Sequence, residues 1–296
     1  MLQRIAIDAH RQPRPMLASD STEANYWRRP LNPLSLALVL SIVDWLTTFA
    51  IAAVGLGFDH GLAPFEREIR PQLSDPRIAY PHTPVSDVRC SKPMLVALAF
   101  LLPLLLIIST QLVRPSRIDL NHALLGMISS LSLTLVIVSL VKVSVGRLRP
   151  DFLARCKPVD GLCTGVPKDI SEGRKSFPSG HTALAFASLG FVGFYWAAKL
   201  LHARTPQVAG SLWKLLLVLA PWAVALLVGL SRIADYWHHW EDVTVGALVG
   251  TVIAYVSYRM RYPSIAEGAE PLVLPTLRGG EGKRHPTGEP LGDYPV

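Results

Sequence analysis

Six apolar segments, each near the length of a membrane-spanning helix, dominate the pattern of hydrophobic and polar positions along this sequence. A helix that crosses a bilayer needs about 20 predominantly apolar residues. The segments fall at residues 34–57, 94–113, 120–141, 182–201, 211–231 and 241–259. The pattern therefore predicts an all-α protein, a bundle of six transmembrane helices.

Two of these segments contain residues that are unusual in a membrane helix. Pro103 is expected to form a tolerated kink, because neighbouring groups can bond to the carbonyl that the proline frees. Asp44 is either functional or a buried structural residue, bonded to a neighbouring helix or protonated in place, and we favour the structural interpretation. The connection 114–119 is so short that the helices on either side must form an antiparallel hairpin.

The polar stretches outside these segments divide the chain into three regions. We predict an N-terminal segment at 1–33, a membrane domain at 34–260 and a disordered tail at 261–296, which is rich in glycine, proline and charge. Basic residues near helix ends favour a cytosolic location for both termini. These residues are Arg114, Arg117, Arg204, Lys214, Arg259 and Arg261. The loops after helices one, three and five then lie on the lumenal or extracellular side.

Composition supports a membrane protein, since 50% of the 296 residues are hydrophobic and only 17% are charged. The net charge of +7 does not indicate nucleic-acid binding, because the basic residues are scattered through loops and form no basic stripe. The three cysteines are too few for a disulfide scaffold or a metal cluster. Cys156 and Cys163 either pair or remain free thiols, and Cys90 is then the odd one.

Three polar motifs fall at the outer ends of helices three to six and share one side of the membrane. They are Lys142 with Arg149-Pro150, then Pro178-Ser179-Gly180-His181, then Ser231-Arg232 with His238 and Asp242. Lysine and arginine side chains suit a phosphate dianion. Ser179 and Gly180 stand at the start of a helix, where free backbone N–H groups and the helix dipole favour an anion.

Two histidines complete a set typical of phosphoryl transfer. A helix would place Asp242 beside His238, four residues earlier, and hold its imidazole in one tautomer. Alone, such a pair is more often structural, but the other two motifs reverse that balance. His239 is also within helical reach of Asp242, and we interpret it as a rim residue. Trp237 and Trp240 are interpreted as anchors at the membrane interface.

Together the three motifs resemble those of the type 2 phosphatidic acid phosphatase family, the lipid phosphate phosphatases. That family has a Lys, six residues and Arg-Pro, then Pro-Ser-Gly-His, then Ser-Arg, five residues, His, three residues and Asp, and all of these residues are present. The stretch RPDFLARC at 149–156 resembles the same region of fungal and plant members that act on phosphatidate and diacylglycerol pyrophosphate. The resemblance spans roughly 34–260 and implies a phosphatidic acid phosphatase/haloperoxidase-type core.

The resemblance also implies a role for each motif residue. His238 would attack phosphorus and form a phosphohistidine, Asp242 would orient His238, and His181 would act first as acid and then as base. The phosphoryl oxygens would be held by Lys142, Arg149, Ser179, Gly180 and Arg232. Neither a metal ion nor another cofactor is expected. Since one histidine must be neutral and the other protonated, we expect a bell-shaped pH profile.

The expected function is hydrolysis of phosphatidate, or of related lipid phosphates such as diacylglycerol pyrophosphate or lysophosphatidate. A vanadate-dependent haloperoxidase shares the phosphate site, but six spans argue against it because those relatives are soluble. A non-enzymatic lipid-phosphate binder or transporter would be expected to lose a nucleophile or acid, yet His181, His238 and Asp242 are all present. The preferred head group, the membrane and the oligomeric state are left open.

Overall fold

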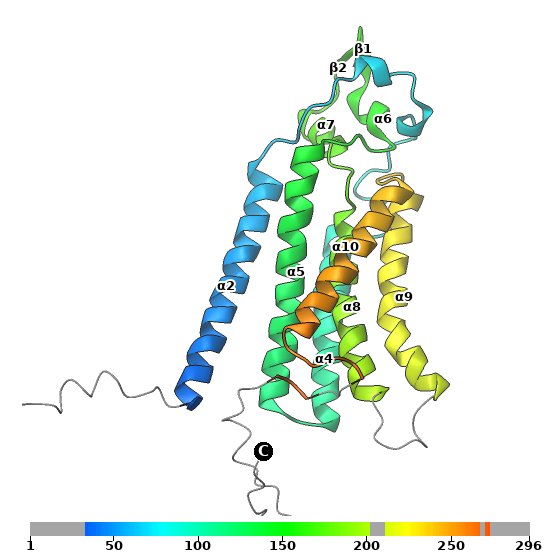
Figure 1. The fold of residues 1–296 in the computed structure, drawn as a ribbon. Helices are drawn as coiled ribbons and strands as arrows, with labels where there is room; N and C mark the ends of the chain where they lie inside the picture. Colours follow the sequence, from blue (N-terminus) through cyan, green and yellow to red (C-terminus); the bar gives the residue numbers. More distant parts are fainter. Residues whose placement is uncertain (1–32, 202–210, 267–269, 273–296) are drawn as a thin grey trace, which may run out of the picture.

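The computed structural model describes residues 33–201, 211–266 and 270–272 (Figure 1). Nearly all of the predicted N-terminal segment, Arg204 and most of the predicted tail lie outside the described residues. The three-region division of the chain therefore stays a prediction.

Long helices running side by side form an elongated bundle, and each lies where the sequence predicts one (Figure 1). The helices are α2 (Pro33–Gly61), a continuous helix made of α3 (Lys92–Val96), η3 (Ala97–Leu101) and α4 (Leu102–Val113), α5 (Arg117–Val145), α8 (Gly180–Leu200), α9 (Leu212–Ala234) and α10 (Trp240–Arg259). The prediction of an all-α protein is confirmed.

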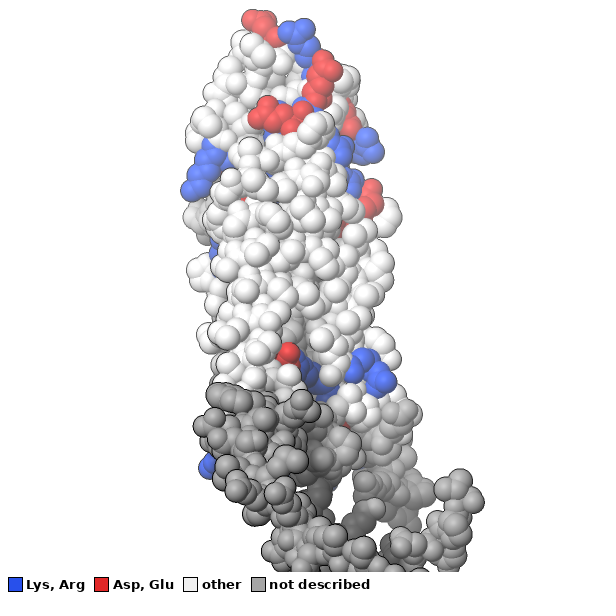
Figure 2. All heavy atoms as spheres, turned by 60° about the vertical axis from the view of Figure 1, so that its left-hand side comes forward, with Lys and Arg blue, Asp and Glu red and all other residues white. Residues whose placement is uncertain are grey.

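Within the described residues, five helices are long and apolar enough to cross a membrane. They are Ser35–Gly61, Lys92–Val113, Arg117–Val145, Gly180–Leu200 and Leu212–Ala234. Figure 2 shows a broad face without charged side chains, between charged groups at the upper end and a few near the lower end. The protein is thus a multi-pass membrane protein. The sixth span stays a prediction, because α10 has 20 residues but includes Glu241, Asp242 and Arg259.

Helix α8 is the central element of the bundle, and small residues bring α10 close to it. A Cβ atom at Gly250 would lie 2.3 Å from the carbonyl oxygen of Ala183, and one at Gly246 would lie 2.7 Å from that of Ser179. Such close approach is typical of membrane helices that pack through small residues. It fixes the start of α10 against the start of α8, where two of the three motifs lie.

The two unusual residues in the apolar segments have local explanations. The expected irregularity near Pro103 is the π-helical turn η3, which ends just before this proline. Asp44 accepts a hydrogen bond of 2.8 Å from Nη1 of Arg261, just beyond α10. Asp44 is thus bonded to another part of the chain, as expected of a structural residue, but its predicted burial is wrong, because its side chain is 46% exposed.

A small cap lies over the end of the bundle where α5 ends and α8 and α10 begin (Figure 1). It contains η1 (Arg70–Gln72), η2 (Pro76–Ile78), α6 (Phe152–Cys156), an antiparallel hairpin of β1 (Pro158–Val159) and β2 (Leu162–Cys163), and α7 (Pro167–Gly173). Cys156 and Cys163 form a disulfide across the hairpin, while Cys90 is free and buried. Ile78, Leu148 and Phe152 pack against Cys156 in the core of the cap.

Candidate active site

Backbone hydrogen bonds draw the three sequence motifs to one end of the bundle. The N–H of Arg149 donates to the carbonyl of Gly173 at 2.9 Å, and the N–H of Ser176 donates to that of Arg147 at 3.0 Å. These bonds join the loop after α5 to the loop before α8. The N–H of Ser179 donates to the carbonyl of Asp242 at 2.9 Å, which adds the start of α10.

A cavity of about 270 Å³ lies at this junction. Five of the eight predicted site residues line it: Lys142, Arg149, Gly180, His181 and His238. Gly180 lies close to the ammonium of Lys142, since a Cβ at position 180 would lie 3.0 Å from Nζ of that lysine. One wall is apolar and is formed by Leu95, Val96, Leu135, Val138 and Leu184.

Several buried polar atoms of the cavity residues have no hydrogen-bond partner among the described residues. They are Nε2 of His181, Nδ1 of His238, and Nε and Nη1 of Arg149. Buried polar groups are nearly always paired, so a cluster of unpaired donors calls for an explanation. A phosphate group, with several acceptor oxygens, fits this set of cationic and imidazole nitrogens.

The other three predicted residues lie beside the cavity but do not line it. Ser179 is the N-cap of α8, and its Oγ accepts a hydrogen bond of 2.9 Å from Oγ1 of Thr182. Arg232 is 1% exposed and its Nη2 donates to Oδ2 of Asp235 at 2.7 Å. Asp242 is fully buried. The guanidinium of Arg232 is therefore held by a carboxylate, which the sequence pattern did not indicate.

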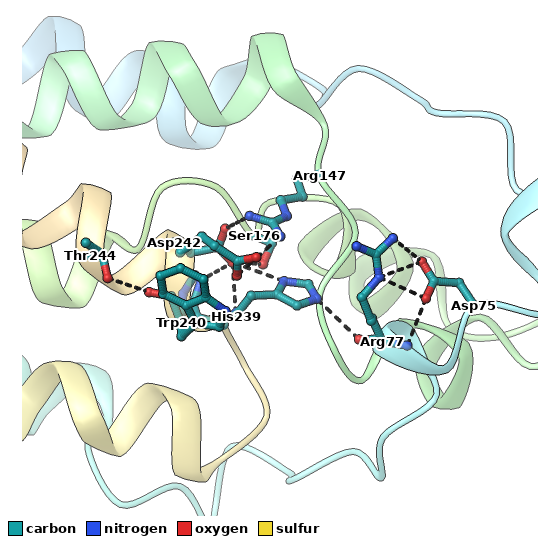
Figure 3. A network of polar contacts seen from close by, with 10 residues as sticks. Asp75, Arg77, Arg147, Ser176, His239, Trp240, Asp242 and Thr244 are labelled. Atoms are coloured by element: carbon teal, nitrogen blue, oxygen red, sulfur yellow. Dashed lines mark hydrogen bonds and ion pairs between the residues drawn. The ribbon is translucent and has the colours of Figure 1, made fainter.

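The expected helical placement of His238 is wrong, because α10 begins at Trp240 and His238 precedes it. Asp242 still approaches the imidazole, with Oδ2 at 3.7 Å from Nδ1 of His238, beyond hydrogen-bond length. The carboxylate instead accepts hydrogen bonds of 2.7 Å from Nη1 of Arg147 and 2.5 Å from Oγ of Ser176 (Figure 3).

His239 also approaches Asp242 but lines a different cavity from the one described above. Its Nδ1 is 3.3 Å from Oδ2 of Asp242, nearer than that of His238, and its Nε2 is 3.2 Å from the carbonyl oxygen of Arg77 (Figure 3). His239 lines a second cavity of about 240 Å³ together with Arg77 and Arg147. It is absent from the lining of the first cavity, where His238 lies.

The interpretation of Trp237 as an interface anchor is wrong, because the residue is 9% exposed and lines the cavity. Its ring lies between two guanidinium groups, with Cζ of Arg149 at 4.6 Å and Cζ of Arg155 at 4.7 Å from the ring centroid. Its Nε1 donates to the carbonyl of Thr83 at 3.1 Å. Trp240, by contrast, is 64% exposed.

Burial and charge set the protonation states in this cavity. Burial, together with the positive charges of Arg149 and Lys142, lowers the pKa of His238 to about 3. The imidazole is therefore neutral near pH 7, as a nucleophile must be. Burial opposes ionisation of Glu172, but Arg149, Lys142 and Lys175 outweigh it and lower the pKa of this carboxyl group.

Sequence reasoning missed several residues that contact the predicted ones. Arg147 lies inside the first motif stretch and Ser176 directly precedes the second, so proximity in sequence offered a weak signal. Asp235 lies inside the third motif stretch and offered the same weak signal, whereas Glu172, whose Oε2 is 3.5 Å from Nη2 of Arg149, gave none. Their positions depend on how the cap and the end of α9 fold.

Comparison with known proteins agrees with this geometry. Residues 123–266 match the PAP2 superfamily. Lipid phosphate phosphatase 2 of Arabidopsis thaliana is 38% identical over 232 residues, covering 74% of this chain and 77% of the relative. Probable diacylglycerol pyrophosphate phosphatase 1 of Schizosaccharomyces pombe is 37% identical over 234 residues, covering 75% and 81%.

Lipid phosphate phosphatase 1 of Arabidopsis thaliana is also similar, at 37% identity over 232 residues, with 75% of this chain and 68% of the relative covered. No solved structure matches the chain. The match at 123–266 contains all three motifs, and the relatives extend the similarity over most of their own length and of this chain. The chain therefore belongs to the PAP2 superfamily.

Proposed function

We propose that this chain is an integral membrane phosphatase that hydrolyses phosphatidate and related lipid phosphates to the dephosphorylated lipid and inorganic phosphate. The observation that carries the proposal is one cavity lined by Lys142, Arg149, His181 and His238, in which the last three have buried nitrogen atoms without a partner among the described residues. The names of the plant and fungal relatives support lipid phosphates, including diacylglycerol pyrophosphate, as the substrate class. Phosphate release from a panel of lipids would identify the preferred substrate within that class.

In the first step, His238 attacks phosphorus. Nδ1 is the nitrogen nearer to Asp242, so Nε2 is the nitrogen available to form the N–P bond. The bond between phosphorus and the lipid oxygen breaks, and His181 donates a proton to that oxygen. Lys142 and Arg149 stabilise the charge on the phosphoryl oxygens, together with the backbone N–H groups at the start of α8.

In the second step, water hydrolyses the phosphohistidine. His181, now neutral, takes a proton from the water, whose oxygen forms a bond to phosphorus while the N–P bond breaks. Inorganic phosphate leaves, and both histidines return to their initial states. Arg232 is paired with Asp235, and Ser179 occupies the N-cap position of α8; for both residues, contact with the phosphoryl oxygens stays a prediction.

We place the active site on the lumenal or extracellular side, with both termini in the cytosol. The disulfide Cys156–Cys163 belongs to the cap beside the site, and such bonds persist on oxidising sides of membranes. The ends of α4, α5 and α10 far from the cap carry Arg114, Arg117 and Arg259, as the positive-inside rule requires of a cytosolic face. The apolar wall, which includes Leu95 and Leu135, would accommodate acyl chains beside the head group.

The test is phosphate release from a panel of lipids by the full-length protein in detergent–lipid mixed micelles. The panel contains phosphatidate, lysophosphatidate, diacylglycerol pyrophosphate, a sphingoid phosphate and an isoprenyl diphosphate, each with and without chelator. We expect release from at least one lipid, unchanged by chelator and absent with His238→Ala. A wild-type protein that binds lipid phosphates but releases no more phosphate than His238→Ala would instead be a binder or transporter.

A further inference from the structure

The buried carboxylate of Asp242 is held mainly by groups that are not among the defining residues of the three motifs. Oδ1 accepts a hydrogen bond from Nη1 of Arg147 at 2.7 Å. Oδ2 accepts one from Oγ of Ser176 at 2.5 Å and one from the backbone N–H of His239 at 3.0 Å. Figure 3 shows Arg147 and Ser176 converging on Asp242, while the imidazole of His239 approaches it as well.

His238 has the weakest hold on this carboxylate. Its Nδ1 is 3.7 Å from Oδ2 of Asp242, and this nitrogen has no hydrogen-bond partner among the described residues. When Nε2 of His238 bonds to phosphorus, the ring gains positive charge and Nδ1 carries a proton. Asp242 is the carboxylate placed to accept a hydrogen bond from that N–H, so its charge and its orientation matter most in the transition state.

Arg147 is the charged residue that holds the carboxylate of Asp242 in this orientation. It lies two residues before Arg149, and its carbonyl accepts a hydrogen bond from the N–H of Ser176. This backbone bond holds Arg147 and Ser176 together, so that the side chains of both donate to Asp242. Arg147 also approaches Glu241, with Nη2 at 3.5 Å from Oε2. It lines the second cavity, and it is absent from the lining of the phosphate cavity.

We infer that Arg147 is a positioning residue for the phosphatase reaction, which acts on His238 only through the carboxylate of Asp242. This inference rests on the proposed function. Two consequences separate it from a phosphate-binding role. Loss of Arg147 should lower kcat with little change in KM, and it should have no further effect once Asp242 has lost its charge.

The experiment is a double-mutant cycle with Arg147→Gln, Asp242→Asn and the double variant, assayed as full-length protein on the best lipid of the panel. We expect Arg147→Gln to lower kcat about 30-fold, the effect of one charge-assisted hydrogen bond, with KM within about twofold. The double variant should lie within about threefold of Asp242→Asn alone. Arg147→Lys keeps the charge without the planar fork and should recover part of the loss.

Arg77→Gln is the matched control. Arg77 lines the same second cavity, but its guanidinium is bonded to Asp75 and its side chain is 76% exposed, so we expect kcat near that of the wild type. If Arg147→Gln does not fold, as judged by size-exclusion chromatography, Ser176→Ala takes its place in the cycle. Ser176→Ala removes the donor to Oδ2 of Asp242 and should lower kcat less than Arg147→Gln does. Added to Asp242→Asn, it should cause no further loss.

Two results would overturn the inference. One is an effect of Arg147→Gln that appears in KM while kcat is unchanged, which would assign Arg147 to substrate binding. The other is a double variant whose loss equals the product of the two single losses. A wild-type protein that is inactive on every lipid would contradict the proposed function itself. An active wild-type protein that gives either of the two results above would contradict only the role of Arg147, so the two failures are distinguishable.

Discussion

Asp242 and Asp119 are two buried carboxylates at opposite ends of the bundle, each in the first turn of a long helix. Asp119 is 4% exposed, and hydroxyl or ammonium groups of three residues surround it. They are the hydroxyl of Tyr195 at 2.7 Å, the hydroxyl of Tyr262 at 3.0 Å and Nζ of Lys199 at 3.0 Å. Asp242 is equally buried, but Nδ1 of His238 beside it has no hydrogen-bond partner within residues 33–201, 211–266 and 270–272.

The difference indicates what each network is for. Around Asp119, donors from α8 and from the segment after α10 meet on a carboxylate of α5, so the charge is neutralised and three parts of the chain are joined. Around Asp242, the donors hold the carboxylate, while His238, His181 and Arg149 have nitrogens that meet no partner in the described part of the chain. A closed polar network stabilises the fold, whereas an open one is arranged for a ligand.

The largest expected effect concerns the open network. His238→Ala and His181→Ala should each lower kcat by at least about 10³-fold, because one removes the nucleophile and the other the proton donor. The double variant should be little worse than either single variant, since the two groups act as a unit. Steady-state phosphate release measures both effects, and unchanged thermal unfolding would show that the fold is intact. If the loss of kcat in the double variant equalled the product of the two single losses, the two histidines would act independently, which would contradict their shared role.

The closed network should behave in the opposite way. Asp119→Ala leaves the ammonium of Lys199 without its carboxylate, so we expect the free energy of unfolding to fall by about 3 kcal/mol. The kcat of the remaining folded protein should not change. Unfolding in mixed detergent, followed by circular dichroism, measures the loss. Asp44→Asn is the matched control, since its ion pair with Arg261 is partly exposed and should contribute less than about 1 kcal/mol.

Apolar periodicity was sufficient to locate the helices, because a span must be long and apolar whatever its partners. It did not predict the cap, whose short helices and hairpin depend on contacts such as those of Ile78 with Phe152. The sixth segment was predicted to begin within one residue of the observed start of α10 at Trp240, but the helical placement of His238 beside Asp242 was wrong. A helix boundary there depends on the capping contact between Asp242 and the N–H of His239, which no periodicity reveals.

The motif residues were predictable because phosphate chemistry restricts which side chains can serve. Lys142, Arg149 and the two histidines meet in one cavity as expected. The partner of Asp242 was not predictable in the same way, since Arg147 is one of 29 lysine and arginine residues and only the folded loop selects it. The burial of Trp237 between two arginines likewise follows from tertiary packing.

Acid should affect the open network through His238. Its pKa is lowered from 6.5 to about 3, so between these values the unfolded chain binds a proton that the folded protein does not. The contribution of this group to stability is therefore lost as pH falls through that window, by about 1 kcal/mol per pH unit. Unfolding measured from pH 7 to pH 4 should show a shallower loss for His238→Gln than for the wild type. Equal slopes would place the acid sensitivity in other residues.

The smallest expected effect tests whether the ring of Trp237, which contacts the guanidinium of Arg149, contributes to catalysis in the open network around Asp242. Trp237→Leu removes the stacking of that ring on two guanidinium groups and the hydrogen bond to Thr83. A cation–π contact contributes about 1 kcal/mol, so kcat/KM should fall about fivefold, with Trp237→Phe recovering most of the loss. Trp240→Leu, at an exposed position, should match the wild type. If Trp240→Leu were the more damaging change, the ring of Trp237 would not hold Arg149, and contact with the membrane surface would matter more.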